Sequence, residues 1–335
     1  MIFLRLRPNE APRTKHQEPP AFPAFLRRDF SVQLPAVQEF LQQLVNGLAL
    51  GAIYALIALG YTMVYGVLRF INFAHSEVFM VGAMIGWALG RHLPPGTLWG
   101  GLLVLAAAMA GCALLGMTIE RLVYRPLRGT ATLNVLITAI GVSLLLQSVF
   151  QHPRVFGATP QLFPPIFPAR NFAVGGVDFS SNQLLVIAVA TLLMIGLELV
   201  VHRTRLGMAM RAVALNPSAA QLVGVNLNAV ISLTFALGSA LAGAGGVLYA
   251  LNYPTVDPLM GVMPGLKAFV AAVLGGIGSI PGAALGGLLL GTVETFVGGS
   301  AWLSTYKDAV AFAVLILILL CRPTGLLGRT APEKV

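Results

Sequence analysis

The chain has 335 residues, of which 57% are hydrophobic and only 10% are charged. Soluble domains average about 25% charged residues, so this composition excludes an ordinary soluble protein and predicts an all-α polytopic membrane protein surrounded by lipid. The net charge of +9 comes without the alternation of basic and aromatic residues that binds a nucleic acid strand. Nucleic acid is therefore excluded as the expected partner, and the basic residues are expected to set the topology in the membrane.

The first 36 residues differ from the rest in composition. They are rich in Pro and in basic residues, and they contain no apolar run long enough for a signal peptide. This pattern predicts a disordered N-terminal extension over residues 1–36, lying in the cytoplasm. Residues 37–329 are predicted to form the membrane domain, followed by a short tail over residues 330–335.

Eight hydrophobic runs follow the extension. A spanning helix needs about 20 predominantly apolar residues, and every run except the short last one is near or above that length. Together they predict eight to ten helices. The runs are Phe40–Tyr65, Ile71–Leu89, Leu98–Ile119, Leu133–Phe150, Leu184–Val201, Val230–Leu251, Leu266–Val297 and Ala309–Leu320.

Basic residues indicate which connections face the cytoplasm. Arg121–Arg128, His202–Arg211 and Arg322–Lys334 are assigned to the cytoplasm, together with both chain termini. The long Pro-rich region His152–Asn182 and the region Asn252–Pro264, which has no Lys or Arg, are assigned to the outside.

A count with one crossing per run conflicts with this assignment. From a cytoplasmic N-terminus, three single crossings would put Arg121–Arg128 outside, and a single crossing by Leu266–Val297 would put Arg322 outside. Both conflicts disappear if Ile71–Leu89 and Leu266–Val297 are broken or re-entrant segments. Such segments contain non-helical backbone, which is tolerated at membrane depth only where it is buried in protein or lines a cavity.

Each segment contains residues suited to an interruption: Asn72 and His75 in the first, and Gly278, Ser279 and Pro281 in the second. The series span, broken segment, span describes residues 40–119 and again residues 230–320, which predicts two pseudo-repeated halves. Interrupted segments at corresponding positions in two halves of a transporter indicate the substrate pathway.

Small residues recur at the four-residue spacing that allows helices to approach closely. Packing within the subunit is the expected use of this spacing. The patterns are Gly47/Gly51, Gly82/Gly86/Gly90, Gly282/Gly286 and Gly287/Gly291.

The chain carries no signature of an enzyme. No Gly-rich loop ends in the Lys-Ser or Lys-Thr of a nucleotide-binding loop, and Lys267 is followed by Ala268. The sequence also lacks a Ser/His/Asp set, a paired-carboxylate site and a metal-ligand spacing. The chain is therefore expected to have no catalytic residue, no metal site and no cofactor of its own.

Ionisable residues inside the membrane are costly and are candidate functional residues. His75 and Glu77 lie in the first broken segment, Lys267 and Glu294 lie in the second, and Glu198 lies near the end of its run. Three interpretations stay open for His75 and Glu77: they fasten the broken helix by hydrogen bonds, line the pathway, or relay protons. Two pairs of sequence neighbours are predicted to be interfacial ion pairs: Glu120 with Arg121, and Lys307 with Asp308.

The segment from residue 202 to residue 228 is a polar interruption between two apolar runs. Asn216 can cap a helix, Pro217 fits its first position and Gly224 fits its end. The predicted helix has about two turns, too few for stability alone in water, so a partner surface is expected to hold it. It indicates a cytoplasmic protein that drives the membrane domain; the alternative is a connecting loop that happens to be helical. The candidate coupling residues are Arg211, Asn216, Pro217, Ala220, Leu222 and Gly224.

Several sequence motifs resemble those of a known family. The runs Asn46-Gly47, Tyr61–Gly66 (YTMVYG) and Ile71–Glu77 (INFAHSE) resemble the permeases of branched-chain amino acid ABC importers, specifically the H-type permease of the leucine/isoleucine/valine system. The string KAFVAAVLGGIGSIPG over residues 267–282 is similar to the same family, as are Tyr306-Lys307-Asp308 and PTGLLGR over residues 323–329. The resemblance covers nearly everything except the N-terminal extension.

This resemblance implies a subunit of a larger importer in the bacterial cytoplasmic membrane. Two permeases, usually different, join two cytoplasmic ATPases that bind ATP and Mg²⁺, and an extracytoplasmic binding protein delivers the amino acid. The resemblance also aligns Arg211–Asn226 with the family's ATPase-docking loop.

The chain departs from the family at two positions. Ser76 occupies a position that is usually Gly, which affects local backbone freedom, and Leu215 occupies a position that is usually Glu, which affects charge pairing with the ATPase. Two alternatives to an amino acid importer remain open: an ABC permease for another small solute such as urea, an amide or a sugar, and an ion-coupled secondary transporter.

Overall fold

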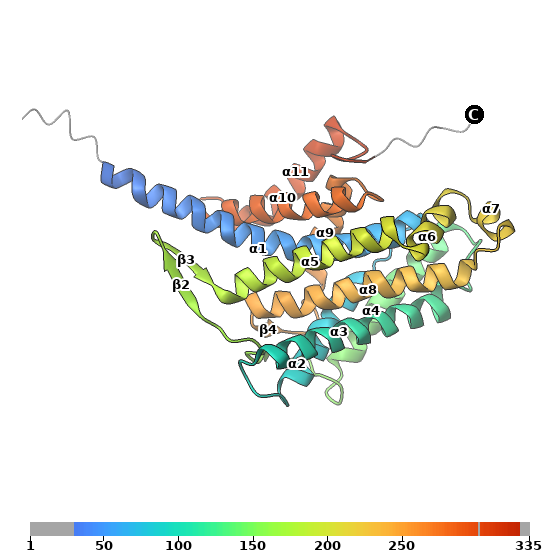
Figure 1. Ribbon diagram of the computed structural model, residues 1–335, viewed down its shortest axis with the longest axis horizontal. Coiled ribbons are helices and arrows are strands. Elements are labelled where there is room, and N and C mark those ends of the chain that lie inside the picture. Colours follow the sequence, from blue (N-terminus) through green and yellow to red (C-terminus); the bar gives the residue numbers. More distant parts are fainter. Residues whose placement is uncertain (1–29, 301, 329–335) are drawn as a thin grey trace, which may run out of the picture. The chain divides into compact units, whose positions relative to one another are not determined.

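The computed structural model describes residues 30–300 and 302–328, and this part of the chain is mainly helical (Figure 1). Residues Met1–Val37 and Gln38–Val335 form separate units. The helices are α1 (Phe30–Leu68), α2 (His75–Gly90), α3 (Leu98–Ile119), α4 (Thr132–Gln151), α5 (Ser181–Arg203), α6 (Arg205–Leu215), α7 (Pro217–Leu222), α8 (Leu227–Asn252), α9 (Val262–Gly275), α10 (Ile280–Gly299) and α11 (Lys307–Cys321).

Short elements connect these helices. A π-helical turn, η2 (Glu120–Tyr124), extends α3, and a 3₁₀ turn, η3 (Ser304–Tyr306), precedes α11. Two small antiparallel pairs complete the fold: β1 (Gln161–Leu162) with β4 (Thr255–Val256), and the hairpin of β2 (Asn171–Val174) with β3 (Val177–Ser180). The predicted all-α polytopic class is confirmed, because seven of the described helices, η2 and η3 included with α3 and α11, are long and apolar enough to cross a membrane.

Arginine side chains join the elements at one end of the second unit. Arg69, after α1, donates to the carbonyl of Ala214 in α6 at 3.4 Å. Arg128, after η2, donates to the side chain of Asn228 at the start of α8 at 2.5 Å. This end, which also carries α7, is called the basic end; α6 and α7 mark it at the right of Figure 1.

The β2–β3 hairpin marks the opposite end, where α1 enters the unit. Gln38 donates to the carbonyl of Gly175 at 3.1 Å, and Gln42 donates to the carbonyl of Asp178 at 2.9 Å. This end is called the hairpin end. The start of the membrane domain and the loop over residues 202–228 therefore lie at opposite ends of this unit, whereas the sequence assigned both to the cytoplasm.

This direction of α1 removes the first conflict in the span count. A chain that enters at the hairpin end reaches the basic end at Leu68, returns along α2, and brings Arg121–Arg128 to the basic end through α3. No re-entrant pair is needed, because the segment Ile71–Leu89 consists of a short loop followed by one continuous helix, α2, which extends to Gly90. The prediction of a broken helix in this segment is wrong, because it rested on an N-terminus at the basic end.

The second interruption is confirmed. Leu266–Val297 divides into α9 and α10, which are separated by Gly276–Ser279. At 1.5 Å per residue the 14-residue α9 is about 21 Å long, short of the roughly 30 Å hydrocarbon core. The two interruptions are thus different in kind, one a loop between two helices and the other a break inside one apolar run.

The structure also changes the predicted boundaries at the N-terminus. Helix α1 begins at Phe30, so it overlaps residues 30–36 of the predicted extension. Residues 1–29 and the predicted tail over residues 330–335 lie outside the described residues.

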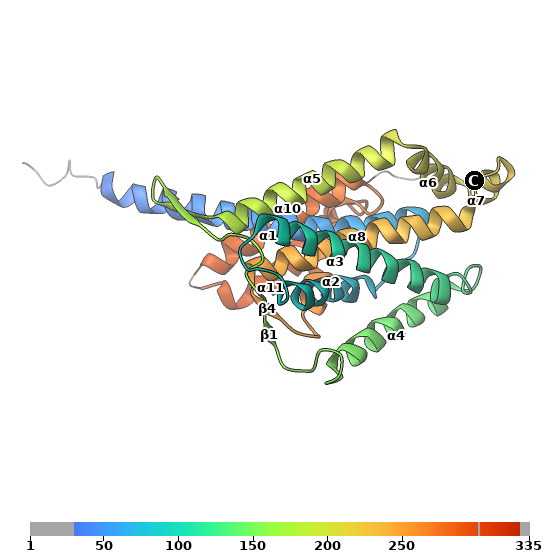
Figure 2. The same cartoon turned by 60° about the horizontal axis from the view of Figure 1, so that its bottom comes forward.

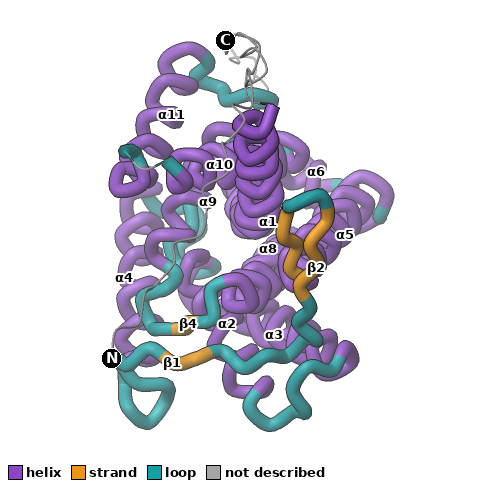
Figure 3. The backbone as a smooth tube through the Cα atoms, turned by 90° about the vertical axis from the view of Figure 1, so that its left-hand side faces the viewer, coloured by secondary structure: helices purple, strands orange, loops and turns teal. Residues whose placement is uncertain are grey.

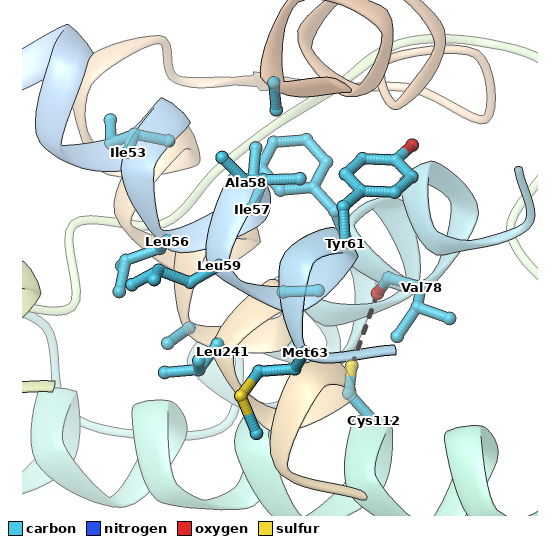
Figure 4. Close-up of a cluster of buried hydrophobic side chains, with 14 of the residues drawn as sticks. Ile53, Leu56, Ile57, Ala58, Leu59, Tyr61, Met63, Val78, Cys112 and Leu241 are labelled. Atoms are coloured by element: carbon cyan, nitrogen blue, oxygen red, sulfur yellow. Dashed lines mark hydrogen bonds between the residues drawn. The ribbon is translucent and has the colours of Figure 1, made fainter. Parts of the chain in front are cut away.

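The core is built on α1, which is buried along most of its length after residue 46. Figure 4 shows Tyr61 and Met63 of α1 beside Val78 of α2 and Cys112 of α3, and the thiol of Cys112 donates to the Val78 carbonyl at 3.4 Å. Figure 3 looks along α1, with α5 and α10 on different sides of it.

Two of the predicted small-residue patterns meet where α1 contacts α10. A Cβ atom added at Gly291 would lie 2.3 Å from the Cα of Gly51, far closer than non-bonded atoms approach. Gly82 of α2 faces Gly243 of α8 in the same way, at 2.5 Å. The expected use of the G-x-x-x-G spacing, packing within the subunit, is confirmed for these pairs.

Candidate functional site

The loop between α1 and α2 reverses the chain at the basic end. Arg69 adopts a left-handed conformation with φ 57°. The side-chain oxygen of Asn72 accepts from the backbone N–H of Ala74 at 3.1 Å and from the hydroxyl of Tyr124 at 2.5 Å. Asn72 therefore fixes the start of α2 and ties this loop to η2.

His75 and Ser76 begin α2 and are buried between helices. The imidazole of His75 packs edge-on against Tyr61 with ring centroids 4.8 Å apart, and its Nε2 lies 2.1 Å from where a Cβ on Gly60 would be. The hydroxyl of Ser76 donates to the carbonyl of Phe73 at 3.0 Å, and its Cβ occupies the space that a side chain at Gly265 of α9 would need. Through these contacts His75 fastens α2 to α1, and Ser76 fastens α2 to α9.

Glu77 fastens a different helix. One carboxylate oxygen accepts from the hydroxyl of Ser143 at 3.1 Å and from the amide of Gln147 at 2.9 Å, both on α4. Helix α4 lies at the periphery (Figure 2), and most of its side chains are at least partly exposed. The two hydrogen bonds to Glu77 are therefore a main polar link between α4 and the core.

The break between α9 and α10 is built from glycine and closed by the C-terminal segment. Gly276 and Gly278 have φ values of 105° and 94°, which L-residues with a Cβ rarely adopt. Ser279 caps α10, with its hydroxyl accepting from the N–H of Gly282 at 3.2 Å, and Pro281 lies in the first turn. The N–H groups of Leu326 and Leu327 donate to the carbonyls of Leu274 and Gly275, at the end of α9.

A buried ionic cluster joins four helices. The ammonium of Lys267 in α9 lies 2.6 Å from Glu294 in α10 and 2.7 Å from Asp308 in α11. The hydroxyl of Tyr54 in α1 donates to the other oxygen of Glu294 at 3.0 Å. Asp308 therefore pairs with Lys267, and the predicted pair of Asp308 with Lys307 is wrong.

Glu120 also has partners other than the predicted Arg121. Its carboxylate is fully buried, lies 3.1 Å from Arg125, pairs with Arg128 and accepts from the hydroxyl of Ser232 in α8. Burial lowers the pKa of the Arg128 guanidinium, and the nearby Glu120 carboxylate opposes that shift. The cluster fixes the loop after η2 to the start of α8.

One cavity at the basic end is lined by the α9–α10 break. It has a volume of about 530 Å³ and is called the α5–α10 cavity. A smaller cavity of about 100 Å³ shares part of this lining and continues to Thr62 and Met63 of α1. The lining of the α5–α10 cavity is Glu198, Val201, His202, Arg211, Ile277, Gly278, Ser279, Ile280, Pro281 and Leu327.

The predicted pathway residues do not meet at one place. Gly278, Ser279 and Pro281 line the α5–α10 cavity, whereas the side chains of Asn72 and Glu77 contact η2 and α4. Their sequence neighbours Ile71 and Ile277 line one small pocket, and a Cβ on Gly66 of α1 would lie 4.0 Å from the Cα of Gly278.

The capped helix expected in the loop over residues 202–228 is present as α7. The side-chain oxygen of Asn216 accepts from the N–H of Ala219 at 3.0 Å, Pro217 is the first residue and Gly224 has φ 85°. An additional helix, α6, precedes it and was not anticipated. Leu222 is 89% exposed, whereas Ala220 is only 3% exposed where α7 packs on its neighbours.

A family model described as "Branched-chain amino acid transport system / permease component" matches residues 43–319. The chain belongs to this permease family. It is 47% identical over 308 residues to the high-affinity branched-chain amino acid transport system permease protein BraD of Pseudomonas aeruginosa, an alignment that covers 90% of this chain and 100% of that protein. It is 44% identical over 305 residues to the corresponding LivH of Escherichia coli (strain K12), covering 88% and 98%.

Several side chains of these clusters were not among the residues predicted from the sequence. Tyr54 gave no signal, because a single Tyr in an apolar run is ordinary. Gln147 and Ser143 did give a sequence signal, since a polar residue within a spanning run needs a hydrogen-bond partner. Their partner, Glu77, was recognised separately, and only the tertiary structure joins them.

Proposed function

We propose that the chain is the membrane-spanning permease subunit of an ATP-driven importer for branched-chain or related small apolar amino acids. It would work in the bacterial cytoplasmic membrane with a second permease, two ATPase subunits and an extracytoplasmic binding protein. ATP and Mg²⁺ would be bound by the ATPases, and this chain would convert their motion into alternating access. Its membership of the permease family supports this proposal.

The structural observation that carries the proposal is the exposed apolar surface beside α7. Leu222 and Val223 are 89% and 79% exposed, and Leu215, just before the cap of α7, is 83% exposed. Such side chains at a polar, basic end of a membrane protein are typical of a protein–protein contact. The Leu215 departure enlarges this apolar surface where the family usually has a charge.

The test is association with the ATPase. Leu222→Asp should abolish co-purification of the ATPase with the permease and abolish uptake, while membrane insertion is retained. Leu162→Asp is the matched control, because Leu162 is 76% exposed but lies at the hairpin end. Ala220→Arg is a poorer probe, since the buried Ala220 anchors α7 and a long side chain there would displace the whole helix.

The substrate class is tested separately, by uptake in cells that lack their own importers. Leucine, isoleucine and valine should be accumulated, and urea, acetamide and ribose should not. Accumulation driven by an ion gradient in the absence of the ATPase would contradict the proposal.

A further inference from the structure

The lining of the α5–α10 cavity combines three kinds of chemical group: a carboxylate, a guanidinium and an apolar wall. The cavity's volume of about 530 Å³ falls within the roughly 300–1,000 Å³ of small-molecule sites. The lining comes from α5, α6, the α9–α10 break and the C-terminal segment. The smaller cavity beside it continues toward α1, so the site connects inward from the basic end.

The first feature is a carboxylate. Glu198 lies 3.0 Å from His202 through one oxygen, and its other oxygen has no hydrogen-bond partner among the described residues. On α5 the residues Leu192, Ile195 and Leu199 form an exposed apolar stripe, whereas Glu198, whose side chain is 44% exposed, lines the cavity. A carboxylate in an apolar run is costly, and a free acceptor oxygen there is available to a cation.

The second feature is a guanidinium. Arg211 of α6 donates one hydrogen bond to the carbonyl of Val201 in α5, which holds the side chain in place. A guanidinium has five N–H groups in a planar fork that suits a carboxylate. The remaining donors of Arg211 are therefore able to serve a bound anion without breaking the contact with Val201.

The third feature is an apolar wall. Ile277 and Ile280 lie on either side of the glycine turn, and Leu327 comes from the C-terminal segment that closes the end of α9. These side chains offer a surface for a branched aliphatic group. Among the described lining residues, the acid and the guanidinium lie on α5 and α6, whereas the apolar side chains lie on the α9–α10 break and on the C-terminal segment.

We infer that the α5–α10 cavity is a transient binding site for the zwitterion of an apolar α-amino acid at the cytoplasmic mouth of the permease. Glu198 receives the ammonium group, Arg211 receives the carboxylate, and the apolar wall receives the side chain. The inference rests on the proposed function and names where the cargo is held before release. Release requires weak binding, with a Kd on the order of 1 mM.

The experiment measures protection of a cysteine in the assembled importer. Leu327→Cys, in a background where the exposed Cys321 is Ser, is labelled by a membrane-impermeant maleimide in inside-out vesicles. With a Kd on the order of 1 mM, about 10 mM leucine should slow the labelling roughly tenfold. Leucinamide, which lacks the carboxylate, and 4-methyl-2-oxopentanoate, which lacks the ammonium, should each protect much less.

Two variants and two controls make the result specific. Glu198→Gln and Arg211→Gln should each abolish protection by leucine, and Arg203→Gln should keep it, because Arg203 is exposed and does not line the cavity. A cysteine in place of the exposed Arg205 should be labelled at the same rate with and without leucine. Equal protection in the parent and in Glu198→Gln, or equal protection by leucine and leucinamide, would overturn the inference.

Leucine uptake by the same importer separates this inference from the proposed function. If leucine is taken up but does not slow labelling at Leu327→Cys, the cavity is not a cargo site and the proposed function stands. If neither leucine, isoleucine nor valine is taken up, the proposed function fails whatever the labelling shows.

Discussion

The ammonium nitrogen of Lys267 lies 2.6 Å from a carboxylate oxygen of Glu294, and both side chains are almost fully buried between α9 and α10. Asp308 and Tyr54 complete the group: Lys267 joins α9 to α10 and α11, and Glu294 accepts the hydrogen bond that ties the group to α1. A charge cluster of this kind is costly to break, because removal of one member leaves the others buried without a partner.

We predict that Lys267→Met destabilises the permease by about 3–5 kcal/mol, since Glu294 loses its counter-charge in a buried place. Asp308→Asn should cost less, because the Asp308 side chain is 39% exposed and can be solvated. The midpoint of thermal unfolding of the purified complex measures both effects. The double variant Lys267→Met with Glu294→Gln should recover part of the loss; a double variant as unstable as Lys267→Met alone would contradict the pairing.

We predict that Glu77→Ala loosens α4. Interhelical hydrogen bonds in membranes are worth about 0.6 kcal/mol on average and up to roughly 1.7, so the loss of two should cost about 1–2 kcal/mol. A cysteine in place of Val142, which is buried on α4, should then react faster with a thiol reagent. The pair Ser143→Ala with Gln147→Leu removes the same bonds from the other side and should have the same effect on labelling. Different effects would mean that Glu77 acts through something other than α4.

We predict that Gly278→Ala costs about 1–3 kcal/mol, because its positive φ is strained for Ala although open space surrounds it. Gly276→Ala should cost more, since a Cβ there would also lie 2.4 Å from the backbone nitrogen of Gly328. Unfolding midpoints of the two variants give the comparison. Equal costs would show that the C-terminal segment does not hold the break.

We predict that Gln38, Arg91 and Ser304 face the same side of the membrane. Each is replaced by cysteine and tested with an impermeant reagent in intact spheroplasts, where all three should be labelled. A cysteine at Gln221 of α7, exposed at the basic end, should be labelled only after the membrane is opened. Labelling of the Gln38 position from the cytoplasm alone would restore the topology that the sequence suggested.

The sequence by itself determined the class and the local elements. Long apolar runs require spanning helices because backbone groups have no other way to be satisfied in lipid. The capped helix at Asn216 and the break at Gly276–Ser279 also follow from local rules, since caps and positive φ depend on a few neighbouring residues. The motifs around His75 and Lys267 were enough to predict the permease family that the comparisons show.

Only the tertiary structure decided the direction of α1 and the partners of the buried charges. The basic residues of the extension favoured a cytoplasmic start, but the hydrogen bonds of Gln38 and Gln42 to the hairpin place that start at the opposite end from α7. Sequence neighbours suggested Lys307 for Asp308, whereas its partner is Lys267, 41 positions away. Ion pairs and cavities depend on which helix faces meet, and that is set by packing across the whole bundle, because interactions between distant segments leave no local pattern.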